Sequence, residues 1–188
     1  MNTGTIVLIV VVALIVLIGA YIGATYNKLV KSKNSVEEAF STMDVYLKKR
    51  WDLIPNIVAS VKGYAKHEAE TLEKVISARN NGYSSMNSQQ KLEANAELNT
   101  AIKSLNVVAE QYPELKANQN FMDLNAQLKK TEEDISNARK FYNAVVKQYN
   151  NTVQMFPSSI VAFMFHFEKR DMFVVEDSAQ REAVKVEF

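Results

Sequence analysis

The sequence predicts an all-α protein made of one membrane anchor and one soluble helical domain. The first 27 residues carry no charged side chain, whereas the rest of the chain is polar with apolar residues at helical spacing. Only five Gly and three Pro occur among the 188 residues. Because turns rely on these two residue types, their scarcity favours helices over a sheet.

The apolar run from Thr5 to Ala24 is long enough to cross a bilayer. About 20 residues at ~1.5 Å rise per residue match the ~30 Å hydrocarbon core. A cleaved signal peptide is the alternative, but it has a basic start, a shorter apolar core and small residues before the cut. Here no Lys or Arg precedes the run, and a cut after Ala24 puts the bulky Ile22 third from the cut. The pattern favours an uncleaved anchor, with membrane lipid as its partner.

The flanking charges predict the orientation of this anchor. Lys28, Lys31 and Lys33 follow the span, and no basic side chain precedes it. Because basic residues stay on the cytoplasmic side, we expect the N-terminus outside the cell and the helical domain in the cytoplasm.

Small residues within the anchor lie four apart, which places them on one helix face. Gly19 and Gly23 form a G-x-x-x-G, and Ala20 and Ala24 repeat the spacing. Such a face lets two backbones approach closely in lipid, so it predicts helix association and a homo-oligomer. The alternative is that Gly and Ala are simply common in membrane helices.

Composition limits the function of the remainder. The net charge of +1 gives no general attraction to nucleic acid, and the absence of Cys excludes disulfides and thiol chemistry. The length allows one further domain. We expect an anchor over residues 1–27, a helical domain over 28–157, and an aromatic segment and tail over 158–188.

Two apolar stripes with steps of three and four predict long helices that share one core. The first stripe comprises Val36, Phe40, Met43, Leu47, Trp51, Ile54, Val58, Val61, Ala65, Leu72 and Val75. The second comprises Phe121, Leu124, Leu128, Ile135, Ala138, Tyr142, Val145, Tyr149 and Phe156, with Thr131 and Thr152 in its gaps. Between them, a shorter helix is marked by Leu92, Leu98, Ile102, Leu105 and Ala109.

Turn-forming residues predict where these helices are connected. Asn80 to Ser85 is a loop of turn formers, and Gln111 to Asn120 is a second connection with room for a short helical turn. Pro55 is ambiguous, because proline removes one helical hydrogen bond while the apolar stripe continues through it. A kink in one long helix and a tight corner between two helices fit equally well.

The segment Leu47 to Glu68, which reads LKKRWDLIPNIVASVKGYAKHE, resembles the signature of the LemA family. The matching frame around it comprises Tyr26-Asn27, Val75 to Arg79, Ala138 to Asn143, Tyr149-Asn150, Phe156 to Ile160 and Val186 to Phe188. The sequence departs from the family pattern at Val184, where proline is usual, and at Met172, where phenylalanine is usual. The resemblance implies an up-and-down antiparallel four-helix bundle with a short irregular C-terminal tail, anchored in the plasma membrane of a bacterium. It implies no particular chemistry.

Candidate catalytic or metal-binding residues are few. The histidines are His67 and His166, and Glu70 lies one helical turn beyond His67. Di-iron sites in four-helix bundles use two Glu-x-x-His pairs with further Glu, and the reversed His-x-x-Glu here has no second copy. We therefore predict no catalytic, cofactor-binding or metal-binding residue and expect the protein not to be an enzyme.

Lys48, Lys49 and Arg50 next to Trp51 suggest either a patch for an anionic ligand or an ordinary solvated face. We favour the solvated face, with Arg50 paired to a carboxylate, because helices often carry such charges outside the apolar stripe. Trp51 lies on the stripe and is expected to be buried.

An aromatic run, Ile160 to Phe167, begins the tail and is too short to span a bilayer. An exposed cluster of this size is unusual on a monomer, so Phe163, Phe165 and Phe167 are candidates for an assembly interface. Burial within the chain and contact with lipid are the alternatives. Val174-Val175 and Val184 to Phe188 are compatible with a short strand.

Together these features predict a membrane-anchored helical scaffold, homo-oligomeric, that organises partners or membrane at the cytoplasmic face. One alternative is a metalloprotein or enzyme that uses the bundle interior. Another is an adaptor in an envelope-stress or proteolysis pathway.

Overall fold

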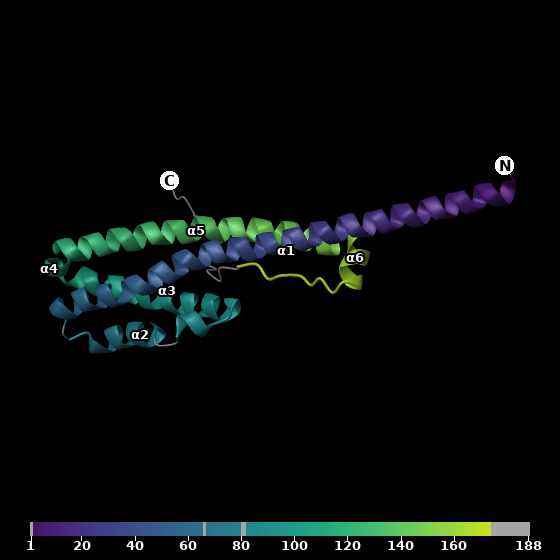
Figure 1. Cartoon of the computed structure of the whole chain (residues 1–188). Coiled ribbons are helices and arrows are strands. Elements are labelled where there is room, and N and C mark those ends of the chain that lie inside the picture. Colours follow the sequence, from purple (N-terminus) through teal and green to yellow (C-terminus); the bar gives the residue numbers. More distant parts are fainter. Residues whose placement is uncertain (1, 66, 80–81, 174–188) are drawn as a thin grey trace, which may run out of the picture.

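The computed structural model describes residues 2–65, 67–79 and 82–173, and all regular structure in them is helical (Figure 1). The α-helices are α1 (Thr3–Tyr64), α2 (Ala69–Arg79), α3 (Ser88–Gln111), α4 (Pro113–Lys116), α5 (Gln119–Gln154) and α6 (Ser158–Met164), and a 3₁₀ turn, η1 (Tyr83–Ser85), precedes α3. The prediction of an all-α fold is confirmed. The expected strand at Val174-Val175 and Val184 to Phe188 lies outside the described residues.

The predicted anchor and the first bundle helix are one helix. Helix α1 runs unbroken for 62 residues, which is about 93 Å at 1.5 Å per residue. Its N-terminal part is long and apolar enough to cross a membrane and projects alone beyond the other helices (Figure 1). The expected segment boundary at residue 27 therefore falls inside a continuous helix.

Pro55 lies inside α1 and does not end it, so the corner considered for Ile54-Pro55 is excluded. Proline has no backbone N–H, which leaves the carbonyl of Trp51 without its intrahelical donor. The Nε of Arg79 from α2 donates to this carbonyl at 3.3 Å. The chain instead reverses at Ala65–Glu68, where the N–H of Ala65 bonds to Val61 O at 2.8 Å and that of Glu68 to Ala65 O at 3.2 Å.

The helices follow an up-and-down order. From the anchor, α1 runs outward, α2 returns, α3 runs outward again, and α5 returns after the short α4 (Figure 1). Helices α1 and α5 form the longest pair. The α2–α3 hairpin covers the part of α1 that is distant from the predicted anchor, where Asp44 and Trp51 bond to it. The four-helix order implied by the resemblance is therefore present.

The core follows the predicted stripes with one correction. Every residue of the first stripe is buried except Phe40, which is partly buried. On the second stripe, Thr131 and Thr152 are buried and bond to the carbonyls of Gln127 and Gln148. Phe156 was expected in this core but is 81% exposed, because α5 ends at Gln154.

Both predicted connections are present with clear helix caps. Asn87 caps α3 by accepting from the N–H of Gln90, whose side chain accepts in return from the N–H of Asn87. The connection after α3 contains the short helix α4, with Pro113 at its first position. Asn118 caps α5 by accepting from Phe121 N–H at 3.0 Å.

After α5 the chain folds back along the bundle. Helix α6 is followed by a turn in which His166 has φ 56°. The N–H of His166 bonds to Phe163 O, and that of Phe167 bonds to Ala162 O. This is the hydrogen-bond pattern of a Schellman motif, with histidine where glycine is usual. The next residues, Glu168–Phe173, run back along α5 and are called the strap (Figure 1).

Candidate functional site

Among the described residues, the most deeply buried charge is that of Arg50 of α1, whose residue is 1% exposed. Its guanidinium connects three helices. One terminal nitrogen donates to Asn99 Oδ1 at 2.5 Å and to Glu132 Oε1 at 2.7 Å. The other donates to Asn95 Oδ1 at 2.6 Å and to the Asn95 carbonyl at 3.1 Å. Because a guanidinium is planar and rigid, this arrangement fixes α1 against α3 and α5.

The charge of Arg50 is balanced by a carboxylate within the same cluster. The Glu132 carboxylate is the counter-charge, and its side chain is 38% exposed. Among the described residues, the Nε of Arg50 is the buried side-chain polar atom without a hydrogen-bond partner. A buried charge is costly unless it is paired and hydrogen-bonded, so each of the four bonds matters to the stability of this cluster.

A second polar group adjoins Arg50 through α3. The Tyr83 hydroxyl donates to Asp44 Oδ1 at 2.6 Å, and Lys91 Nζ donates to Asp44 Oδ2 at 2.5 Å. Lys91 Nζ also lies 5.1 Å from the centroid of the Tyr83 ring. The Asn95 amide, which accepts from Arg50, donates to the Lys91 carbonyl at 2.8 Å. The pKa of the Tyr83 hydroxyl is raised well above its usual value. Burial is the largest cause, and the hydrogen bond to Asp44 is the second.

A groove of about 500 Å³ opens beside these residues, between α3 and α5. Its apolar lining includes Leu47, Leu92 and Ile135, and Arg50, Asn95, Asn99 and Glu132 form its polar wall. The end of the strap forms another wall, where the Arg139 guanidinium lies 5.3 Å from the centroid of the Phe173 ring.

Two asparagines of α5 hold the strap by its backbone. Asn150 donates to the Arg170 carbonyl at 2.8 Å and accepts from the Arg170 N–H at 2.9 Å. Asn143 makes the same pair with Phe173, at 2.9 Å and 2.8 Å. These asparagines lie seven residues apart, about 10.5 Å along a helix, and three extended residues cover a similar distance.

Two tyrosines on the same face of α5 add further bonds. The Tyr149 hydroxyl donates to the Glu168 carbonyl at 2.8 Å, and that of Tyr142 donates to the Asp171 carbonyl at 3.1 Å. Burial raises the pKa of both hydroxyls, which favours the protonated form that donates these bonds. The strap is thus attached through backbone atoms, which makes its position insensitive to most of its own side chains.

The four residues of the predicted basic patch separate in the structure. Lys48 pairs with Asp52 at 2.5 Å on the surface, and Lys49 is exposed. Arg50 was expected on a solvated face and is instead buried, although its predicted carboxylate partner exists in Glu132. Trp51 is 4% exposed and packs on Tyr83 with ring centroids 5.0 Å apart, so its predicted burial is confirmed.

The spacing of Leu47, Arg50 and Ile54 contained a signal for this burial. Steps of three and four place Arg50 on the same helix face as the two apolar residues. A cation at a core position needs partners from other helices, which are Asn95, Asn99 and Glu132. Periodicity in one segment does not identify these partners.

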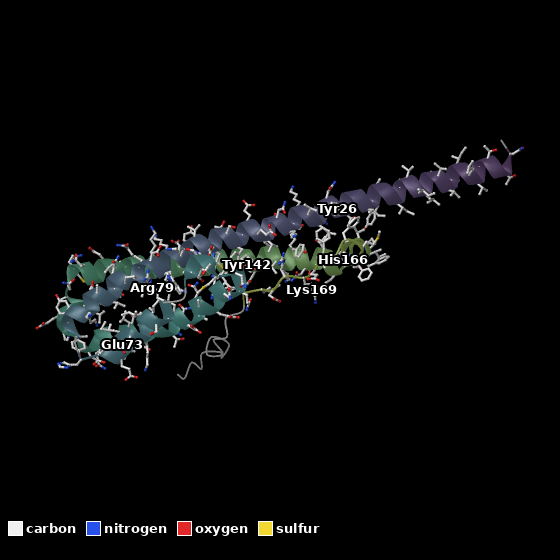
Figure 2. All side chains as sticks on the ribbon, turned by 60° about the horizontal axis from the view of Figure 1, so that its bottom comes forward. Tyr26, Glu73, Arg79, Tyr142, His166 and Lys169 are labelled. Atoms are coloured by element: carbon white, nitrogen blue, oxygen red, sulfur yellow. The ribbon has the colours of Figure 1, made fainter. Side chains whose placement is uncertain are left out.

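The two histidines take separate positions. His67 is exposed at the turn after α1, and Glu70 bonds to Lys74 at 2.7 Å, which lowers the pKa of that carboxyl. His166 lies at the other end of the bundle, in the turn that ends α6 (Figure 2). In the described ranges, no three His, Cys, Asp or Glu side chains are grouped as metal ligands.

The small residues of the anchor lie on an open surface. Gly19, Ala20, Gly23 and Ala24 are all exposed. A Cβ added to Gly19 or Gly23 meets no heavy atom within 4 Å. The face predicted for helix association is therefore accessible, and the association itself stays a prediction.

The three phenylalanines predicted to form an interface have different environments. Phe163 is 84% exposed, whereas Phe165 packs on Tyr26 of α1 with ring centroids 4.7 Å apart. Phe167 is half-buried and packs on the main core, and its ring centroid lies 5.8 Å from that of Tyr26. The exposed aromatic surface in this region therefore includes Phe163, parts of Phe165 and Tyr26 and, unexpectedly, Phe156.

Comparison with known sequences agrees with this architecture. The sequence model of the LemA family matches residues 39–188. The chain is 25% identical over 143 residues to Protein LemA of Metamycoplasma hominis. That alignment covers 76% of this chain and 65% of the relative, so the chain spans slightly less than two thirds of the relative's length.

Proposed function

The chain belongs to the LemA family, and we propose that it is a membrane-anchored scaffold that projects a rigid helical rod into the cytoplasm as a homo-oligomer. The observation that supports this function best is the continuity of α1 from the apolar N-terminal part into the bundle. A flexible linker would uncouple the bundle from the membrane, whereas a continuous helix sets its direction and distance.

The reach of this rod follows from the length of α1. From Lys28 to Tyr64 the helix extends about 55 Å at 1.5 Å per residue. The α2–α3 hairpin packs around its distant half, so the broad end of the bundle is held away from the bilayer. Partners or further subunits would be bound there or along the sides of the rod.

The bonding state of the buried polar groups also supports a structural role. The terminal nitrogens of Arg50 are bonded to Asn95, Asn99 and Glu132, and Asp44 is bonded to both Tyr83 and Lys91. Side chains that satisfy one another in this way hold helices in register.

The proposed orientation rests on Lys28, Lys31 and Lys33 after the span. Because the chain contains no Cys, a single Ser84→Cys variant gives one labelling site in the exposed loop before α3. We expect this thiol to be shielded from an impermeant reagent in intact cells and labelled after permeabilisation. Rapid labelling of intact cells would reverse the orientation.

The proposed assembly is tested by the mass of the full chain in mild detergent, measured by light scattering and corrected for bound detergent. We expect an oligomer that is weakened by Gly19→Leu with Gly23→Leu, because bulky side chains keep the two backbones apart. Val16→Leu is the matched control within the span. A monodisperse monomer at micromolar concentrations would overturn the scaffold function.

A further inference from the structure

We propose that α6 and its neighbouring aromatic residues form a second membrane contact, which inserts into the headgroup region beside the anchor and prefers anionic lipid. This inference rests on the proposed function, because it requires α1 to span a bilayer. The surface concerned, called the collar, comprises Tyr26, Phe156, Ile160, Phe163, Met164 and Phe165.

Packing against α1 holds the collar at one level. Val161 and Ala162 of α6 are buried against Leu29, which is itself fully buried. The Phe165 ring packs on Tyr26, three residues before Leu29. Figure 2 shows Tyr26 and His166 together at the end of the bundle from which the apolar part of α1 projects alone.

This level coincides with the membrane interface. If the apolar run from Thr5 to Ala24 fills the hydrocarbon core, Tyr26 lies two residues, or about 3 Å, beyond its edge. The headgroup region adds about 5–8 Å on each side of the core. Aromatic side chains are enriched at this depth, because the rings are apolar and their polar edges reach water.

Most apolar side chains of the collar are exposed. Phe156 and Phe163 are the most exposed large apolar residues of the bundle, and Ile160, Met164 and Phe165 are also exposed. Contiguous apolar surface of this kind marks an interaction site on a soluble domain. Because Val161 and Ala162 use the opposite face of α6, docking on α1 does not cover it.

Basic side chains lie on the water-facing side of the collar. Lys28 and Lys31 line a shallow hollow between α1 and α5, and Lys33 lines another with His166, Lys169 and Arg170. Glu168 is the acidic residue of the second hollow. Lys28 to Lys33 lie about 6–14 Å beyond the hydrocarbon edge. The Debye length is ~8 Å at physiological salt, so the nearer charges act on anionic headgroups.

Lipid fits this surface better than a second copy of the chain. Ile22 of the apolar run packs on the same cluster that holds α6, so the collar adjoins the anchor, and Lys28 and Lys31 lie at the depth of the headgroups. An interfacial segment combines these two features, an apolar face and adjacent Lys and Arg.

The experiment measures depth in the bilayer with an environment-sensitive fluorophore on single cysteines in the full chain, reconstituted in vesicles with and without phosphatidylglycerol. The three sites are Leu14→Cys in the anchor, Phe163→Cys in the collar and Phe141→Cys on α5. Phe141 is the matched control, because it is an exposed Phe outside the collar. Lipids with a spin label near the top of the acyl chain serve as quenchers.

We expect quenching at residue 163 to exceed that at residue 141 severalfold and to increase with phosphatidylglycerol. Quenching at residue 14 without quenching at residue 163 would overturn the collar proposal while leaving the anchor intact. Protection of residue 163 from aqueous iodide without lipid quenching would also overturn it, in favour of a subunit contact. No quenching at residue 14 would overturn the anchor itself, and the collar with it.

Discussion

Single polar residues inside the bundle determine how its helices are aligned. Arg50 bonds to two residues of α3 and one of α5, and Asp44 receives two donors from η1 and α3. Apolar contacts tolerate small sliding movements, whereas these bonds have fixed lengths and directions. The polar residues therefore specify one packing arrangement among several that bury similar apolar area.

Removing Arg50 should destabilise the protein strongly. Arg50→Ala leaves Asn95, Asn99 and Glu132 without their donor, and we expect a loss of about 3–5 kcal/mol in the free energy of unfolding. The exposed neighbour provides the control, since Lys49→Ala should change stability by less than about 0.5 kcal/mol. Urea unfolding followed by circular dichroism measures both. A loss below about 1 kcal/mol for Arg50→Ala would contradict the role of this cluster.

The environment of Tyr83 predicts that the free energy of unfolding falls in alkaline solution. Its pKa is raised in the folded protein by burial and by Asp44, so folding favours the protonated hydroxyl. This contribution is complete below the unfolded pKa of about 10 and is lost as pH rises above it. The unfolding free energy should therefore fall more steeply above pH ~10 in the wild type than in Tyr83→Phe. Lysines titrate in both proteins, so the difference between their profiles reports Tyr83, and parallel profiles would refute this prediction.

At the scale of elements, one long helix is maintained through a proline because another helix supplies the missing donor. Pro55 leaves the Trp51 carbonyl free, and Arg79 at the end of α2 bonds to it. The same contact attaches α2 to α1. The carbonyl left free by Pro55 thus provides the acceptor for a tertiary hydrogen bond that positions the α2–α3 hairpin.

A double-mutant cycle tests this coupling. Arg79→Met should cost about 1 kcal/mol in the wild type, because it leaves the Trp51 carbonyl unsatisfied. In the Pro55→Ala background, the N–H of residue 55 satisfies that carbonyl, so the same change should cost clearly less. Equal costs in both backgrounds, measured by urea unfolding, would show that Arg79 acts elsewhere. Lys74→Met, on the exposed side of α2, is the control.

The whole molecule has two unlike halves. Far from the anchor, four helices surround a common core, whereas near the anchor α1 and α5 are accompanied by α6 and the strap (Figure 1). The half next to the apolar N-terminal part of α1 therefore depends on the bonds from Asn143 and Asn150 to the strap. The distant half depends on the α2–α3 hairpin and on Arg50.

Hydrogen exchange should resolve these halves as separate units of stability. In Asn143→Ala with Asn150→Ala, we expect faster exchange at the amides of Arg170 and Phe173 and in the α1 segment 33–40. Exchange in the segment 51–61, under the hairpin, should be unchanged. Asn151→Ala, on the exposed side of α5, is the matched control. Acceleration throughout the bundle would show that the protein opens as one unit.

Several features could be predicted from local sequence pattern alone. The uncharged run ending at Asn27 identified the apolar segment, and the three-to-four spacing identified the buried faces of α1, α3 and α5. The position of Trp51 on the apolar stripe correctly predicted its burial in the core. These inferences succeed because burial along a helix repeats with the helical period. This period is visible in the sequence of a single segment.

The contacts between residues far apart in the sequence could not be predicted from such patterns. The continuation of α1 through Pro55 and the burial of Arg50 each depend on other helices. The partners of Arg50 lie 45 to 82 residues away, and the strap is held by asparagines 20 and 30 residues before their targets. Helical periodicity shows which face of a segment is buried, but the pairing of faces is set by long-range packing and by donors that satisfy one another in three dimensions.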